Sequence, residues 1–152
     1  MPLDKNSFLV DVSESDRTDF GRVEFAAQPE PQKVFSAIWA LESQVNNGGF
    51  LQYFASSDGD TANYAPTALR AIGAHACAGV VERALRVASG SPLAESQEAR
   101  EALVESLSDA AREQLDGLDT EFFAYPDNLT ELLFSYVASH PKSFGAVPNE
   151  QA

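Results

Sequence analysis

The side chains best suited to catalysis or metal binding in this sequence are two histidines and a single cysteine. His75 and Cys77 lie two positions apart in an alanine-rich stretch with helical character. At about 100° per residue, side chains two apart on a helix point in nearly opposite directions and cannot bind one ligand together. His140 precedes Pro141 at the end of a predicted helix, where a capping role is expected. This small set of histidine and cysteine ligands does not predict a zinc site.

Other catalytic signatures are missing from the sequence. Asp58-Gly59-Asp60 is similar to the start of a calcium-binding loop, but no Glu occupies the twelfth position that such a loop requires. The sequence contains no Gly-x-Ser-x-Gly motif, no P-loop and no dinucleotide-binding fingerprint. Because no nucleophile and base stand in a recognisable arrangement, we expect no enzymatic activity, no metal and no cofactor.

The most distinctive short motif combines amides, glycines and aromatic rings. It consists of Asn46, Asn47, Gly48, Gly49, Phe50 and Tyr53. We favour a structural role, in which the glycines turn the chain between two helices, the amides bond freed backbone groups and the rings fill the core. The Asn47 amide in particular is expected to satisfy buried backbone groups. The alternative is a small-molecule-binding or enzymatic pocket around Asn46, Asn47 and Tyr53.

A row of carboxylates is the strongest physical pattern in the chain. The hydrophobic period predicts one long helix from Glu95 to Asp116, closed by Gly117. On such a helix, six carboxylates fall within roughly 60° of the direction of the first of them. These are Glu98, Glu101, Glu105, Asp109, Glu113 and Asp116. Apolar side chains, including Leu103 and Leu107, gather on the opposite side.

This acidic face has two interpretations, a solvated face that keeps the protein soluble and a binding surface for a basic partner. Charged helix faces commonly carry lysines as partners, but no lysine occurs between Lys33 and Lys142. Each like-charged pair four residues apart costs a few tenths of a kcal/mol, about 0.2–0.5. Only Arg112 is expected to relieve the repulsion, whereas Arg100 falls on the apolar side and is predicted to form a structural ion pair.

The overall charge narrows the class of partner. Twenty-three acidic residues against ten Lys and Arg give a net charge of −13. This field repels nucleic acid and anionic membranes, so we expect neither as a direct partner and favour a basic protein surface. The lone Cys77 excludes an internal disulfide and suits a reducing compartment. Neither a secretory signal nor a membrane-spanning stretch is recognisable, and a cytoplasmic location is expected.

The chain length fits one domain with its own core. We predict an all-α fold, a compact bundle of about six to eight helices over residues 31–140. Residues 1–30 are expected to form an irregular acidic arm with room for one short helix or strand, and residues 141–152 a loose tail. The predicted core centres on Phe35, Ile38, Trp39, Phe50, Phe54, Leu107, Leu133 and Val137.

The segment from Trp39 to Phe54, which contains the Asn-Asn-Gly-Gly-Phe motif, resembles the bacterial DNA-mimic protein family. The resemblance runs from about Gln32 to His140 and includes Ala71–Ala74 and Leu118–Phe123. It implies an all-α fold and, in many members, a dimer. In the member after which the family is described, surface carboxylates imitate DNA phosphates and occupy the DNA-binding face of a transcriptional repressor. The resemblance therefore implies a chain that sequesters a basic DNA-binding protein, such as a transcription regulator.

The spacing of the acidic face sets a condition on mimicry. One carboxylate per helical turn gives a spacing of about 5.4 Å. A DNA strand carries a phosphate every ~3.4 Å along its axis. One helix is too sparse to imitate a duplex, so we expect a second acidic surface, from the arm or from the second copy in a dimer.

Overall fold

The computed structural model describes residues 3–90 and 92–147, and within these residues the chain is helical with no strand. Its elements are α1 (Lys5–Glu14), η1 (Phe25–Ala27), α2 (Glu30–Ala55), η2 (Ser57–Thr61), α3 (Ala65–Ala71), α4 (His75–Ser89), α5 (Gln97–Ser106), α6 (Asp109–Phe123), α7 (Leu129–Ala138) and α8 (Pro141–Phe144). The predicted all-α bundle is confirmed.

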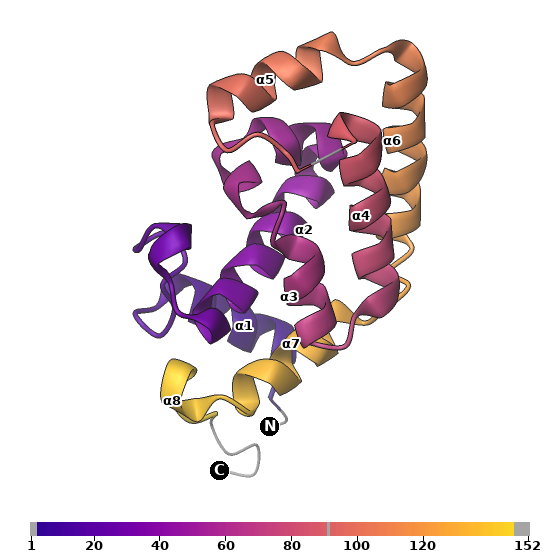
Figure 1. Cartoon of the computed structure of the whole chain (residues 1–152). Helices are drawn as coiled ribbons and strands as arrows, with labels where there is room; N and C mark the ends of the chain where they lie inside the picture. The colour runs from indigo at the N-terminus through magenta and orange to yellow at the C-terminus, as the bar shows by residue number, and fades with distance from the viewer. Residues whose placement is uncertain (1–2, 91, 148–152) are drawn as a thin grey trace.

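Helix α2 is the centre of the arrangement (Figure 1). It contacts α3, α5, α6 and the η2 turn, while α4 packs between α3 and α6. The α5 helix lies across one end of the molecule, and α1, α7 and α8 form the opposite end. Helix α5, which carries part of the predicted acidic face, therefore lies at the opposite end of the molecule from α1.

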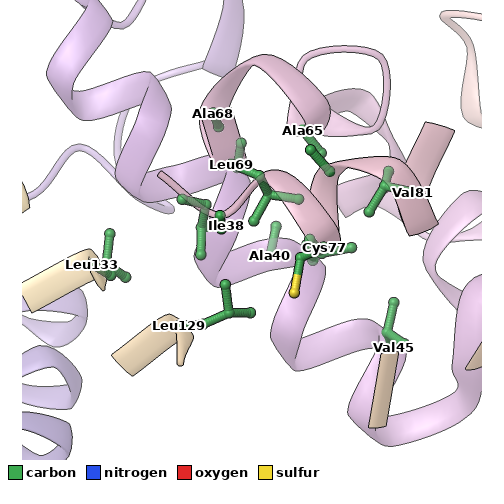
Figure 2. Packing of buried hydrophobic residues seen from close by; sticks show 14 of the residues in the cluster. Ile38, Ala40, Val45, Ala65, Ala68, Leu69, Cys77, Val81, Leu129 and Leu133 are labelled. Carbon is green, nitrogen blue, oxygen red and sulfur yellow. The ribbon is translucent and has the colours of Figure 1, made fainter. Parts of the chain in front are cut away.

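One continuous apolar core joins these helices. Figure 2 shows side chains of α2, α3, α4 and α7 converging on one another, among them Ile38, Leu69, Cys77 and Leu129. The predicted core residues that are buried are Phe35, Ile38, Phe50, Phe54, Leu133 and Val137. Trp39 and Leu107 are only partly buried. The prediction of core residues was therefore correct for most positions on α2 and α7, whereas Trp39 and Leu107 lie at the edge of the core.

The N-terminal arm holds a ten-residue helix that packs into the core. The Asp4 side chain caps α1 by accepting a hydrogen bond from the Ser7 backbone amide. Phe8, Leu9 and Val12 are buried, and the Phe8 ring meets Phe134 of α7 edge to face, with 5.5 Å between ring centres. The arm is thus a structural part of the domain.

Gln32 ties the arm and the C-terminal segment to the start of α2. Its carbonyl oxygen accepts from the Asp19 amide at 2.8 Å, and its amide nitrogen donates to the carbonyls of Arg17 and Ser143. Phe144 of α8 is 1% exposed. The first part of the expected loose tail is therefore packed, while residues 148–152 lie outside the described residues.

The predicted long acidic helix is wrong, because the chain breaks it into α5 and α6. Leu107 is extended (φ −64°, ψ 139°), and Ser108 caps α6 by accepting from the Ala111 amide at 3.1 Å. A serine that satisfies a first-turn amide favours a new helix start over continuation of the old one. Gly117, the predicted stop, lies inside α6, which continues to Phe123.

Candidate functional site

The six predicted partner-binding carboxylates are divided between two helices. Glu98, Glu101 and Glu105 lie on α5, and Asp109, Glu113 and Asp116 lie on α6. All six residues are exposed, and none forms an ion pair within the described part of the chain. Because α5 and α6 run in different directions in Figure 1, these carboxylates do not form one straight row. We call the six residues the acidic surface.

Arg112 does not neutralise the acidic surface in the predicted way. Its guanidinium donates to the Val104 carbonyl at 2.6 Å and to the Leu107 carbonyl at 3.4 Å. Those carbonyls belong to the end of α5, where few helical amides remain to donate to them, and the Val104 carbonyl also accepts from the Leu107 amide. Arg112 therefore stabilises the junction between α5 and α6, and it forms no ion pair with the six carboxylates among the described residues.

Arg100 fixes α5 to the rest of the domain. Its side chain is 0% exposed, and its guanidinium forms the predicted ion pair with Asp60 at 2.9 Å. The guanidinium also donates to the carbonyls of Phe54, Ser56, Ala94 and Glu95. Burial of a charged group is tolerated when its donors are all bonded in this way.

The approach of Arg100 to the end of α2 depends on a small residue in η2. A Cβ atom at Gly59 would lie 2.6 Å from Nε of Arg100 and 2.7 Å from the Phe54 carbonyl oxygen. The absence of a side chain at Gly59 therefore lets the guanidinium reach the backbone. This contact anchors α5, which carries Glu98, Glu101 and Glu105 of the acidic surface.

The Asn-Asn-Gly-Gly motif forms the predicted corner within α2. The two glycines and Asp119, rather than the asparagines, give the corner its backbone geometry and hydrogen bonding. Gly48 and Gly49 interrupt the helical backbone within α2, and Gly49 has a φ of +76° that favours glycine. Asp119 of α6 accepts a hydrogen bond from the Phe50 amide at 2.8 Å, which caps the second half of α2. Burial raises the pKa of Asp119.

The two asparagines do not satisfy buried backbone. Both are exposed, and Asn47 makes no side-chain hydrogen bond among the described residues, so its predicted role is wrong. Asn46 donates to the Tyr125 hydroxyl at 2.9 Å, and that hydroxyl donates to Glu42 at 3.1 Å.

Tyr53 is separated from the two asparagines. It is 0% exposed, and its hydroxyl bonds to that of Thr61 at 2.6 Å. Burial raises the pKa of Tyr53 well above its ordinary value. Asn46, Asn47 and Tyr53 therefore do not line one pocket, although Asn46 lines a hollow without the other two residues.

The cysteine and the two histidines, the other candidates for catalysis or metal binding, are not arranged as a reactive site in the described part of the chain. The Cys77 thiol is buried, which raises its pKa to about 11 and keeps it protonated at neutral pH. His75 is exposed. His140 contacts the Tyr136 carbonyl through Nδ1 at 2.7 Å, a capping contact at the end of α7 as predicted. No group of three or more potential metal ligands occurs among the described residues.

A surface hollow is lined by Asn46, the only one of its residues that the sequence analysis assigned to a pocket. Its volume is about 230 Å³, and its lining comes from three helices: Asn6, Leu9 and Val10 of α1, Trp39, Glu42, Ser43 and Asn46 of α2, and Thr130 of α7. The sequence offered one signal for it, the aromatic and acidic side chains of Trp39 and Glu42, which precede the glycine corner on the same helix. The α1 wall could not be predicted, because the arm was expected to have room for one short helix or strand but not to pack beside α2.

Comparison with known proteins places this geometry in a family. Searches of curated proteins and of solved structures found no match to the chain. None of the helices in residues 3–90 and 92–147 has the length and apolar character needed to cross a membrane. A family model for DMP19-like proteins matches residues 26–140, which is close to the range of the resemblance noted in the sequence. The chain belongs to the DMP19-like protein family, a family of DNA-mimic proteins.

Proposed function

We propose that this chain is a DNA mimic that binds a basic DNA-binding protein, such as a transcription regulator, through the acidic surface of α5 and α6. Binding would sequester that protein from DNA. The observation that carries the proposal is the set of six exposed carboxylates without an ion pair among the described residues. The net charge of −13 and membership of a DNA-mimic family support it.

The break between α5 and α6 changes how such a surface would work. A single helix presents one charge per turn along one line, about 5.4 Å apart, which is sparser than a DNA strand. Two helices that run in different directions spread the same charges over an area. We therefore propose that the partner contacts both helices, and that Arg100 and Arg112 hold them in their relative positions.

A homodimer and a cytoplasmic location complete the proposal. A second copy would supply the additional acidic surface that the charge spacing requires, and light scattering of the purified chain tests for it. The cytoplasm is the place where bacterial DNA-binding regulators act, and it suits a lone cysteine.

The test is a competition for basic DNA-binding proteins. The immobilised chain is incubated at low salt with bacterial proteins that were first isolated on a duplex-DNA column, and bound proteins are then challenged with free duplex DNA. A mimic should retain a small set of these proteins and release them to the DNA. Retention should fall steeply as salt rises, because exposed charges are screened beyond about 8 Å at physiological ionic strength.

Two triple variants with equal changes in charge make the test specific. Glu101→Gln, Glu105→Gln and Asp109→Asn together should abolish retention, because they remove half of the acidic surface. The control combines Asp11→Asn, Glu14→Gln and Asp16→Asn, which are exposed residues at the opposite end of the molecule. Equal retention by both triple variants would contradict the proposed surface.

A further inference from the structure

The hollow between α1, α2 and α7 has the composition of a binding site. Its polar residues are Asn6, Glu42, Ser43, Asn46 and Thr130, and its apolar residues are Leu9, Val10 and Trp39. At about 230 Å³ it is smaller than the pockets that hold drug-sized ligands, which begin at about 300 Å³. Its size therefore suits one side chain or a compact small molecule.

Glu42 is the only charged residue that lines the described hollow. One of its oxygens accepts from the Tyr125 hydroxyl at 3.1 Å, and it forms no ion pair with any described residue. Lys5 on the neighbouring helix donates instead to Glu131 at 2.7 Å. Burial raises the pKa of Glu42, so a bound cation would relieve an unfavourable charge.

Trp39 gives the hollow an aromatic wall that is already fixed in position. Its ring stacks on Phe35, with ring centres 5.4 Å apart and planes 10° from parallel. Asn46 uses its amide nitrogen to donate to Tyr125, and its oxygen accepts no hydrogen bond within the described part of the chain. A carboxylate, an aromatic ring and an amide oxygen together suit a planar cation that donates several hydrogen bonds.

We propose that this hollow binds an alkylguanidinium group, with the guanidinium head between Glu42 and Trp39 and the aliphatic stem against Leu9 and Val10. A guanidinium is favoured over an ammonium because it stacks on aromatic rings and bonds carboxylates through two donors at once. The group can belong to a free small molecule or to an arginine of another protein. None of the acidic-surface residues lines the hollow, so this inference is independent of the proposed function.

The protein supplies its own probe, because Trp39 is its single tryptophan. Titration with butylguanidinium should change the tryptophan fluorescence and reach saturation, whereas butylurea, its neutral counterpart, should not. In Glu42→Gln the half-saturating concentration should rise at least tenfold. Glu98→Gln removes the same charge from the acidic surface and should leave the titration unchanged.

Folding of the variants can be separated from loss of the site. Glu42→Gln keeps an acceptor for Tyr125, and circular dichroism should match the parent chain. Asn6→Lys changes an exposed residue at the rim of the hollow and places a competing ammonium there, so it should also weaken binding. The same response to butylguanidinium in the parent, Glu42→Gln and Asn6→Lys would overturn the proposal, as would an equal response to butylurea.

A second pair of probes identifies the source of the guanidinium. N-acetylarginine amide carries the side chain as a protein presents it, and N-acetylcitrulline amide is its neutral control. Saturation at lower concentration by N-acetylarginine amide than by butylguanidinium would assign the hollow to an arginine of another protein. The reverse order would assign it to a free guanidine, and no saturation by either cation would overturn the inference.

Discussion

Arginine side chains donate to different kinds of acceptor, carboxylates or backbone carbonyls, in two regions of this molecule. Arg70 of α3 forms a bidentate pair with Glu82 of α4, and Arg83 of α4 forms one with Glu121 in the last part of α6; all four side chains are accessible to solvent. On α5 and the first part of α6, Arg100 and Arg112 direct their guanidinium groups mainly to backbone carbonyls, and the six carboxylates of the acidic surface have no ion pair among the described residues. The contrast shows that local cations position the acidic surface without neutralising it.

The largest expected effect tests the anchor of that surface. Arg100→Ala removes the donor to four carbonyls in the interior, so the free energy of unfolding should fall by about 3–5 kcal/mol, measured by chemical denaturation. Asp60→Asn is the matched control. The Asp60 side chain is 59% exposed, so that change should cost less than ~1 kcal/mol. Equal losses from the two variants would assign the stability to the ion pair and remove the contrast between the regions.

The second prediction concerns the corner that positions α6 against α2. Gly49→Ala should lower the free energy of unfolding by about 1–3 kcal/mol, because a side chain would be strained at a φ of +76° and would collide with the Asp119 carboxylate. Gly117→Ala is the control inside α6, where no atom lies within 4 Å of the added Cβ. It should raise stability by roughly 0.5–1 kcal/mol. Thermal melts of both variants measure the difference in stability. Unchanged stability in Gly49→Ala would contradict the proposed role of Gly49 in the corner.

The third prediction tests the paired carboxylates of the other region. Arg83→Ala breaks a pair whose side chains are 45% and 50% exposed, so it should cost under ~1 kcal/mol of unfolding free energy. Arg112→Ala should cost more, about 1–2 kcal/mol, because the carbonyls of Val104 and Leu107 at the end of α5 both lose the guanidinium donor. Urea denaturation of the two variants ranks them, and the opposite ranking would break the comparison between the regions.

The smallest expected effects follow from the break between α5 and α6. Glu105→Gln should raise stability by about 0.2–0.5 kcal/mol, since it relieves repulsion with Glu101 four residues earlier. Asp109→Asn should lower stability by about 0.3–1 kcal/mol, because Asp109 lies in the first turn of α6, where a negative charge is favourable. Precise thermal melts should show higher stability for Glu105→Gln and lower stability for Asp109→Asn, which would confirm the helix break. Higher stability for both variants would instead fit one continuous helix.

The helical fold could be predicted because each long helix carries its own hydrophobic period. The period of Val34, Ile38, Leu41 and Val45 was sufficient for α2, and these residues are all buried. The break at Leu107 and Ser108 was missed because the apolar and acidic periods pass through it unchanged. Only the serine cap marks it, and serine is common within helices as well as at their starts.

The candidate sites were harder to predict because they depend on contacts between distant residues. The sequence indicated that Arg100 needed a carboxylate, and Asp60 supplies it from 40 positions away. Nothing in the sequence indicated the carbonyls at the end of α2. The hollow likewise needs α1 beside α2, and the contact between Glu42 and Tyr125 spans 83 positions. Local periodicity contains no information about such pairings.

The Gln32 side chain has a practical consequence for handling the protein. It bonds to backbone groups on either side of Thr18 and to Ser143, so the segment that follows α1 is held to α8. Figure 1 places α1 and α8 at the end of the molecule opposite α5. A chain that is held on a surface through exposed residues of α1 or α8 therefore presents α5 to the solution.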